Sequence, residues 1–357
     1  MLLHMDFPSG SPGIYGTDDT KMMDGLWAQQ GGFVVLMEDP DPNVTGNVLR
    51  VGTGGGANGT YIRLVLPALK TAVGVAFRLW MGNLPSGVYS PPSLQFLDNL
   101  NNRLMSVLVD SSGYLHVRNS NALVSGSDLA ATSVPVLVAG AWNHIEVKYT
   151  VGAGTGAIEI RVNGITVLNV GSLAFSATSV AQIRFSSGDN ASSQSRTYYY
   201  KDLIVWDTTG SFNNDFMGSC SVKELIPDGD VALNWALTGS VTGYGAVNEA
   251  PPDDDTKYIY AVTPAPAADL MSLTDLPVDV TSVRGLMIIN RSKNTDGGDG
   301  KLQMGLVSGA STQLYTDRQI TTTYTYWTDI SETDPATAAA WLPGAVNAMN
   351  LRLNRTL

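Results

Sequence analysis

The sequence is short of the residues on which several classes of protein depend. Its 357 residues include one cysteine, Cys220, so no internal disulfide can form, and we interpret this cysteine as a small apolar filler. The net charge of −11 comes without clustered lysine and arginine, which argues against nucleic-acid binding. No run approaches the ~20 apolar residues of a membrane helix, and the N-terminus lacks the basic and apolar regions of a secretory signal. We therefore expect a protein that is made in a cytoplasm and does not insert into a membrane.

Motifs of catalysis are absent as well. The three histidines, His4, His116 and His144, form no H-E-x-x-H or H-x₃₋₅-H arrangement, and neither a G-x-S-x-G nucleophile elbow nor a G-x-x-x-x-G-K-[ST] loop occurs. The paired strand carboxylates of jelly-roll glycosidases are also missing. We therefore expect no catalytic, cofactor-binding or metal-binding residues, and a protein that is not an enzyme.

One glycine-rich loop matches a cofactor motif in its spacing alone. Gly54, Gly56 and Gly59 satisfy the G-x-G-x-x-G pattern of dinucleotide-binding proteins. That pattern needs a helix directly afterwards, whose N-terminus faces the pyrophosphate, and a strand-like run, Thr60 to Leu66, follows instead. A flexible hairpin loop explains the same glycines without a helix.

Short strands separated by turn residues are abundant, and they are clearest from Trp142 to Val170. Apolar and polar residues alternate over 145–149 and again over 158–162, which is typical of half-buried β-strands. Asn163-Gly164 supplies the positive backbone angles of a tight hairpin turn. Three antiparallel strands in a row need a second apolar layer to cover their inner face.

The side chains of this stretch predict its buried face and the class of the fold. We place Trp142 in the core of a sandwich, and Glu146 and Glu159 on its solvated face. A tryptophan followed by alternating apolar residues, a loop and I-x-V-N-G over 160–164 resembles the laminin G-like and concanavalin A-like jelly rolls. The resemblance implies an all-β protein with an antiparallel β-sandwich. Such folds host carbohydrate binders, glycan hydrolases and structural modules, so the fold does not select a function.

The strand pattern predicts three parts of the chain. Residues 1–207 are expected to form the lectin-like β-sandwich, 208–233 a connecting segment, and 234–357 a smaller β-rich domain. In the last part we expect strands over 258–262, 283–290, 302–307 and 322–329, and the core anchors Trp235, Trp327 and Trp341.

Two stretches in the second half carry a more specific resemblance. Residues 207–216 read D-T-T-G-x-x-N-N-D-F, and residues 247–258 read V-N-E-x-P-P-D-D-D-T-x-Y. Together with Asn234-Trp235 they resemble structural proteins of tailed bacteriophages, over roughly residues 140–357. The resemblance implies a non-catalytic virion protein, either a tail or fibre component or a capsid decoration, made in the cytoplasm of the host bacterium. It implies that the lectin-like sandwich serves assembly or surface attachment and that residues 234–357 serve virion assembly. Its partners would be other virion proteins, and the frequency of trimeric appendages in phage suggests a homotrimer.

Two other functions stay open. As a glycan-binding adhesin, the sandwich would recognise a host surface glycan through exposed aromatic and polar side chains at one rim, for which Tyr89, Tyr198 and Asn190 are the candidates. As a polysaccharide hydrolase, it would need paired carboxylates, which the strands do not show.

The acidic turns also have two interpretations. Residues from Asp207 to Asp215 could form an ordered turn network, in which the Asp207 side chain bonds to the backbone two residues on, or could coordinate Ca²⁺. The acidic loop 253–255 is expected to be a solvated turn and the loop 293–300 a long hairpin tip, and for both a metal site is the alternative. None of the three has the ligand spacing of an EF-hand loop, so Ca²⁺ is the alternative and an ordered turn is the expectation.

Overall fold

A computed structural model of the chain describes residues 3–5, 13–15, 27–30, 33–42, 47–52, 61–85, 92–119, 128–175, 178–186, 197–249, 252, 254–261, 267–295 and 299–356. The chain divides into two compact units, Met1–Val222 and Lys223–Leu357, which we call unit 1 and unit 2. Residues 208–233, expected as a connecting segment, are thus shared between the units, and unit 2 already has a strand at Pro227–Ala232. No helix among the described residues is long and apolar enough to cross a membrane.

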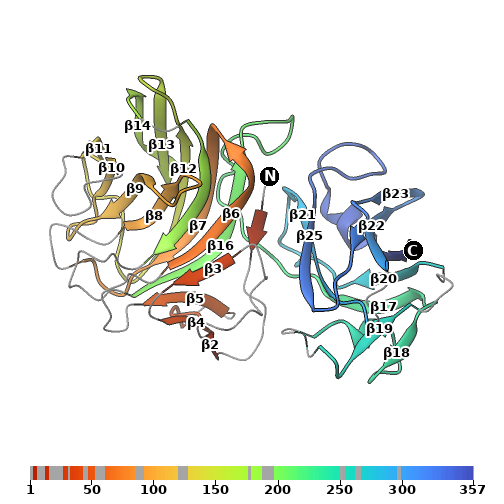
Figure 1. The fold of residues 1–357 in the computed structure, drawn as a ribbon. Coiled ribbons are helices and arrows are strands. Elements are labelled where there is room, and N and C mark those ends of the chain that lie inside the picture. Colours follow the sequence, from red (N-terminus) through yellow and green to blue (C-terminus); the bar gives the residue numbers. More distant parts are fainter. Residues whose placement is uncertain are drawn as a thin grey trace. The chain divides into compact units, whose positions relative to one another are not determined.

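Unit 1 contains two antiparallel sheets, which confirms the predicted all-β sandwich class (Figure 1). Sheet 1 has nine strands in the order β14-β13-β12-β7-β16-β5-β4-β2, with β1 also paired to β16. Sheet 2 has seven strands in the order β11-β10-β9-β8-β15-β6-β3. The strands are β1 (Leu3–Met5), β2 (Gly13–Tyr15), β3 (Trp27–Gln30), β4 (Phe33–Glu38), β5 (Asn47–Gly52), β6 (Tyr61–Lys70), β7 (Ala72–Trp80), β8 (Pro92–Leu97), β9 (Arg103–Val109), β10 (Leu115–Asn119), β11 (Ala130–Ala131), β12 (Trp142–Thr150), β13 (Gly156–Val162), β14 (Ile165–Leu173), β15 (Val180–Ser186) and β16 (Thr197–Asp207).

The core of unit 1 lies between the two sheets. Successive side chains of a strand point to opposite faces, so every second residue enters this core. Phe77 of β7 and Phe185 of β15 meet edge to face across it, with ring centroids 5.3 Å apart. Tyr200 of β16 is fully buried beside them, and its hydroxyl donates to the backbone carbonyls of Ser93 and Ser186 at 3.0 and 2.8 Å. The buried hydroxyl is thereby satisfied, as the low polarity of the core requires.

The glycine-rich stretch from Gly54 to Gly59 lies outside the described residues, but both of its flanks are described. The strand expected after the glycines is confirmed as β6. β5 belongs to sheet 1 and β6 to sheet 2, so the connection passes from one sheet to the other. The interpretation as a hairpin loop is therefore wrong, because a hairpin joins neighbouring strands of one sheet.

The stretch from Trp142 to Val170 forms β12, β13 and most of β14, and Asn163 and Gly164 turn between the last two with φ angles of 50° and 82°. The placement of Trp142 in the core is wrong. Tyr149 of the same strand faces the core, and strand alternation puts Trp142 on the opposite, outer face of sheet 1. Its indole N–H donates to Oδ1 of Asp39 at 3.0 Å, which explains its partial burial there.

Glu146 lies on the outer face as predicted, but it is not solvated. Its exposed fraction is 0%, because residues 208–222 cross over this part of sheet 1. Oε1 of Glu146 accepts the backbone N–H groups of Met217 and Gly218, both at 3.0 Å. Met217 and Val222 also join an apolar cluster with Trp206, and this packing explains why unit 1 extends to residue 222.

Two further expectations for this region can be compared with the structure. Cys220 is half-buried and packs against the same apolar cluster, in line with its interpretation as a filler. Glu159 lies on the outer face, half-buried, and pairs with Arg161 at 3.0 Å.

Unit 2 is also built from antiparallel strands, with a six-stranded sheet in the order β17-β20-β26-β22-β23, where β24 pairs with β22, and two two-stranded sheets, β18-β19 and β21-β25. Trp341 is a core anchor as predicted, with an exposed fraction of 1%, and Trp235 packs against the same core while partly buried. Trp327 is half-buried, and the Arg318 guanidinium lies 5.5 Å from its ring centroid. The elements are β17 (Pro227–Ala232), β18 (Ala236–Thr238), a 3₁₀ helix (Tyr244–Ala246), β19 (Tyr258–Tyr260), β20 (Asp269–Leu273), β21 (Leu286–Ser292), β22 (Lys301–Ser308), β23 (Ser311–Leu314), β24 (Arg318–Gln319), β25 (Thr325–Ser331), α1 (Pro343–Asn347) and β26 (Asn350–Arg355).

Candidate functional site

The outer side of sheet 2 carries a cluster of polar side chains on β6 and β15. Phe185 and its neighbours Ile62 and Ile183 are buried in the core, so the residues that alternate with them point away from it. These outward residues include Arg63 and Arg184, which stand directly opposite each other in the antiparallel register. We call the cluster the arginine face, and it consists of Tyr61, Arg63, Asn101, Gln182 and Arg184.

The two arginines converge on one oxygen atom. Nη1 of Arg63 and Nη2 of Arg184 both donate to Oδ1 of Asn101, each at 3.1 Å. Asn101 lies in the turn between β8 and β9, where its φ angle is 65°, a value that asparagine tolerates better than most residues. Asp98 fixes this turn, because its Oδ1 accepts the backbone N–H groups of Leu100 and Asn102 at 2.8 Å. The acceptor between the arginines is therefore held in place by the turn.

The flanks of the two guanidinium groups are also defined. The Arg184 guanidinium lies 4.3 Å from the ring centroid of Tyr61, which is a cation–π contact. Nη1 of Arg63 also lies 3.5 Å from Oε1 of Gln182. These contacts hold both side chains over the sheet.

The electrostatics of the arginine face are unfavourable without a further partner. The pKa of Arg184 is lowered, mainly because the guanidinium is partly buried. The interaction with Tyr61 raises this pKa, and repulsion by Arg63 and Arg103 lowers it. Like charges directly opposite each other on neighbouring strands cost ~0.2–1 kcal/mol. Among the described residues, neither Arg63 nor Arg184 forms a salt bridge with a carboxylate. In a chain whose net charge is −11, this is a local positive charge that the described residues leave uncompensated.

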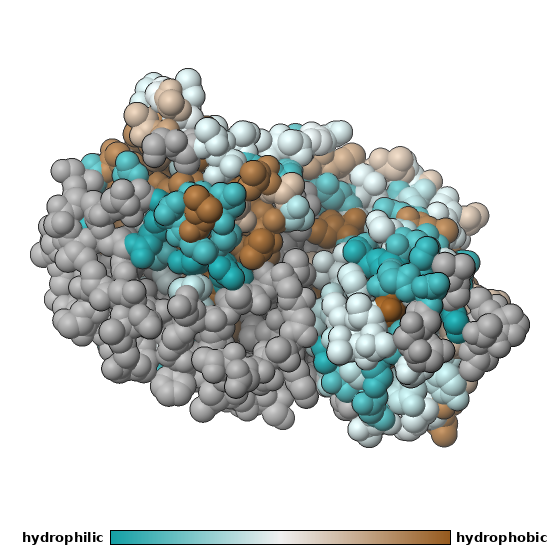
Figure 2. Space-filling model, in the orientation of Figure 1, coloured by the Kyte–Doolittle hydropathy of each residue, from teal (hydrophilic) through white to brown (hydrophobic). Residues whose placement is uncertain are grey.

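The arginine face is partly accessible: Asn101 is exposed, Tyr61, Arg63 and Arg184 are half-buried, and Gln182 is buried. It borders apolar side chains. Val65 follows Arg63 on the same side of β6 and is 40% exposed, and Leu100 precedes Asn101 and is 74% exposed. In the space-filling view, hydrophilic residues surround a hydrophobic spot on the surface over β8 and β9 (Figure 2). The site thus offers hydrogen-bond donors and apolar contact side by side.

The polar row continues from Arg184 across sheet 2 but becomes buried. Gln95 stands opposite Arg184, and Ser106 stands opposite both Gln95 and Arg118. These three residues are exposed by only 3, 0 and 5%, respectively. The accessible end of the row is therefore the arginine face.

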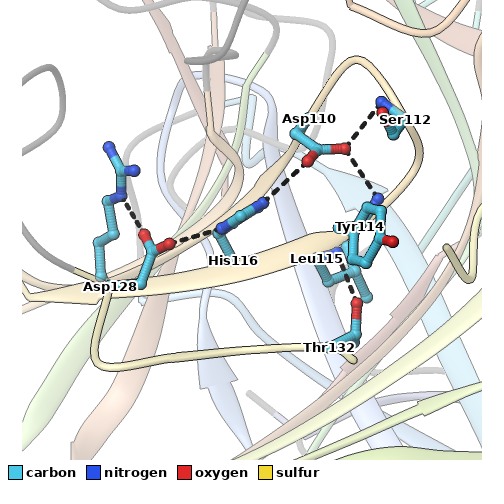
Figure 3. A network of polar contacts seen from close by, with 8 residues as sticks. Asp110, Ser112, Tyr114, Leu115, His116, Asp128 and Thr132 are labelled. Carbon is cyan, nitrogen blue, oxygen red and sulfur yellow. Dashed lines mark hydrogen bonds and ion pairs between the residues drawn. The ribbon is translucent and has the colours of Figure 1, made fainter. Parts of the chain in front are cut away.

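A second polar network lies on the same sheet around His116 (Figure 3). Nδ1 of His116 lies 2.6 Å from Oδ2 of Asp128, and Nε2 lies 3.2 Å from Oδ2 of Asp110. Nε of Arg118 donates to the other oxygen of Asp128 at 2.6 Å. Both ring nitrogens thus face carboxylate oxygens.

This network holds a turn and a neighbouring segment together. Burial raises the pKa of Asp128, but hydrogen bonds from Arg118 and His116 outweigh it, so the pKa lies below its usual value. The pKa of Asp110 is also lowered, because hydrogen bonds from Tyr114 and Ser112 and the contact with His116 outweigh burial. The arrangement joins β10 to the β9–β10 turn and to the segment before β11.

Among the described histidine side chains, the other one, His144, is not available as a proton carrier. His144 on β12 is buried, and burial, followed by repulsion from Arg78, lowers its pKa to about 4. The side chain of His4 lies outside the described residues.

The residues proposed from the sequence as a sugar-binding rim do not form one. Tyr198 is 1% exposed and faces the core of unit 1, where its ring lies 6.3 Å from that of Tyr200. The expectation that Tyr198 is an exposed rim residue is therefore wrong, because strand alternation points its side chain into the core. Tyr89 and Asn190 lie outside the described residues.

The acidic turns are occupied by cations of the protein itself. Asp207 pairs with Lys70 at 2.5 Å and accepts the backbone N–H of Thr209, and Asp215 pairs with Lys148 at 2.8 Å. In unit 2, Asp254 accepts two hydrogen bonds from Arg291, and Asp255 pairs with Lys293. Asp253 and residues 296–298 lie outside the described residues. In the described part of the chain, no group of three or more His, Cys, Asp or Glu side chains is arranged to hold a metal ion.

The arginine face was missed by the sequence reasoning, although a weak signal for it exists. Ile62-Arg63-Leu64 and Ile183-Arg184-Phe185 share the pattern I-R-apolar, in which a strand presents one cation opposite two core residues. The pattern shows that each arginine points outward. It does not show that the two strands are neighbours, which is the fact that creates the site.

The chain matches no protein-family model and no curated protein. Among solved structures it is similar to the cellulose induced protein Cip1, with 16% identity, a TM-score of 0.43, and coverage of 61% of this chain and 100% of that one. It is also similar to the alginate lyase Aly36B (14% identity, TM-score 0.40, 57% and 96% coverage). A third neighbour is the carbohydrate binding module CBM66 from Bacillus subtilis (10% identity, TM-score 0.32, 51% and 98% coverage). Similarities this low say nothing about the ligand or activity of this chain.

Proposed function

We propose that unit 1 is a non-catalytic glycan-binding module and that the arginine face holds the sugar. The observation that carries the proposal is the convergence of Arg63 and Arg184 on Asn101, with Gln182 beside them, on the outer side of a sheet. Guanidinium and amide groups provide donors and acceptors in fixed directions, which suits the hydroxyl groups of a sugar. Val65 and Leu100 provide apolar contact for its C–H groups.

The site is built on rigid parts of the fold, which supports binding. Arg63 and Arg184 belong to paired strands, and Asn101 is held by the Asp98 turn. Side chains that are already fixed lose less entropy when a ligand binds, so less of the interaction energy is lost to ordering them.

The non-catalytic part of the proposal rests on the sequence. The paired strand carboxylates of jelly-roll glycosidases are missing from it. Of the described histidine side chains, His144 is buried and cannot reach a substrate.

The proposal can be tested with the full chain on a glycan array, followed by titration calorimetry with each glycan that binds. We expect saturable binding that Arg184→Ala weakens and Arg50→Ala leaves unchanged, because Arg50 is an exposed arginine of sheet 1. The absence of saturable binding to any glycan would refute the proposal. Polysaccharide size should also stay unchanged after prolonged incubation, and shortened chains would show that the protein is an enzyme.

We further propose, from the two sequence motifs alone, that the protein belongs to the particle of a tailed bacteriophage. The motifs are those over 207–216 and 247–258. Mass spectrometry of purified particles tests this, and the absence of the protein from them would end the proposal. Its copy number would separate a capsid decoration from a tail or fibre component, and sedimentation of the purified chain would test the expected trimer.

A further inference from the structure

We infer that the glycan bound by the arginine face carries an acid group, a carboxylate or a sulfate, that is seated between Arg63 and Arg184. This inference rests on the proposed function and names the chemical class of the ligand. It follows from the hydrogen bonds and charges of the two arginines.

The first argument is the imbalance between donors and acceptors. Each guanidinium has five N–H donors, and the two groups share one neutral acceptor, Oδ1 of Asn101. The other acceptor near Arg63 is Oε1 of Gln182, at 3.5 Å. The printed contacts of both arginines are made by their terminal Nη groups, and each of these groups carries a second N–H. A planar group with two or three oxygens would accept from both arginines at once, as carboxylates and sulfates do.

The second argument is the charge. A neutral sugar would leave the repulsion between Arg63 and Arg184 in place, whereas an anion between them compensates it. An acidic sugar therefore gains from the removal of this repulsion, and a neutral sugar of the same shape does not. Selectivity for an acidic over a neutral sugar therefore comes from the two like charges that the pairing of β6 and β15 places opposite each other.

The third argument limits the ligand to a local acid group. Outside the arginine face the protein is acidic overall, with a net charge of −11, so a dense polyanion such as a nucleic acid is repelled by the rest of the surface. The exposed Val65 and Leu100 beside the arginines suit a sugar ring, whose C–H groups can pack on them. An acidic glycan combines one local charge with such a ring.

Titration calorimetry on the full chain with three probes tests the inference. The probes are an oligouronate, the same oligouronate with its carboxylates reduced to alcohols, and a sulfated oligosaccharide of similar length. We expect an acidic probe to bind about tenfold or more tightly than the reduced one, because a charge-assisted hydrogen bond is lost in the latter. Which acidic probe binds more tightly identifies the acid, and raising the salt concentration should weaken binding, since the charges are partly exposed.

Variants complete the test. Arg63→Gln and Arg184→Gln should each reduce affinity for the acidic probe about tenfold or more, while Arg50→Gln, which removes the same charge from sheet 1, should not. Circular dichroism and thermal unfolding would show that each variant is folded. Equal affinity for the oligouronate and its reduced form would overturn the inference and leave the proposed function standing. A DNA oligomer is the fourth probe, and preferential binding of it would overturn the inference. Failure of every glycan on the array would remove the proposed function as well.

Discussion

Arg63 and Arg184 stand opposite each other on β6 and β15 and donate to the same oxygen of Asn101, each at 3.1 Å. Two like charges in direct register weaken the pairing of the strands that carry them. The like charges lower the stability of the fold, whereas the proposed anionic ligand needs both of them. A pair of side chains that costs stability in this way is typical of a binding site and not of a structural contact.

Replacing Arg63 by glutamine should change fold stability and ligand affinity in opposite directions. Glutamine keeps an N–H donor for Asn101 and removes the repulsion, so the free energy of unfolding should rise by up to ~1 kcal/mol while affinity for an acidic glycan falls. Denaturant unfolding of the full chain measures the first effect and calorimetry the second. Arg50→Gln, the matched control, should change stability by less than ~0.5 kcal/mol. A loss of more than 1 kcal/mol in Arg63→Gln would show that the arginine serves the fold.

Gly74 makes a different contact with its neighbour strand, because β7 and β16 bring Trp206 directly over it. A Cβ atom at residue 74 would lie 1.9 Å from Cε2 of Trp206, whose side chain is fully buried. Gly74→Ala should therefore lower the free energy of unfolding by ~1–3 kcal/mol or more through overpacking. Gly171→Ala in β14 is the control, since a Cβ there meets nothing within 4 Å. Equal unfolding midpoints for the two variants would contradict the packing described for Trp206.

The strands of unit 1 could be predicted from the sequence because their signal is local. Alternation over 145–149 and 158–162 predicts β12 and β13, and Asn163-Gly164 predicts the turn after them. The same alternation, applied strictly, would have placed Trp142 with His144 and Glu146 on the outer face. The assignment to the core gave more weight to the size of the side chain than to its phase in the strand.

The candidate site could not be predicted, because it depends on which strands are neighbours. Arg63 and Arg184 are brought together by the pairing of β6 with β15, and Asn101 by the turn after β8. The burial of Glu146 has the same kind of cause, since Met217 and Gly218 lie far along the chain. Contacts of this kind are decided by tertiary packing, and no local pattern in the sequence encodes them.

Glu146 should make the stability of unit 1 depend on pH, because it binds the segment of residues 208–222 that covers this part of sheet 1. Burial raises its pKa, although hydrogen bonds from Gly218 and Met217 and the charge of Arg161 oppose the rise. A pKa that is higher in the folded than in the unfolded state stabilises the fold below the unfolded pKa, and this contribution is lost as the pH rises through the folded pKa. Glu146→Gln keeps an acceptor and cannot ionise, so it should be more stable than the wild type at neutral pH, with the difference vanishing in acid.

Glu146→Ala is the contrasting variant at the same residue. It leaves the backbone N–H groups of Met217 and Gly218 without their acceptor, and each buried donor left unpaired costs ~1–3 kcal/mol. Thermal unfolding of both variants between acidic and neutral pH measures the two effects. Equal thermal stability of Glu146→Gln and Glu146→Ala at neutral pH would show that the hydrogen bonds from Met217 and Gly218 do not stabilise the fold.

Asp128 should show the opposite dependence on pH. Its pKa lies below the usual value because hydrogen bonds from Arg118 and His116 outweigh burial, so its contribution is present above the unfolded pKa and is lost as the pH falls through the folded one. Asp128→Asn should lower the free energy of unfolding by ~1–3 kcal/mol at neutral pH, since it weakens two charge-assisted bonds of 2.6 Å. Asp215→Asn is the control, because it removes the same charge. Its ion pair with Lys148 is exposed, so its loss should lower the free energy of unfolding by only ~0–1 kcal/mol. Hydrogen exchange should show faster opening of β10 and β11 in Asp128→Asn alone. Equal protection of these strands in the two variants would mean that the network around His116 does not stabilise this edge of sheet 2.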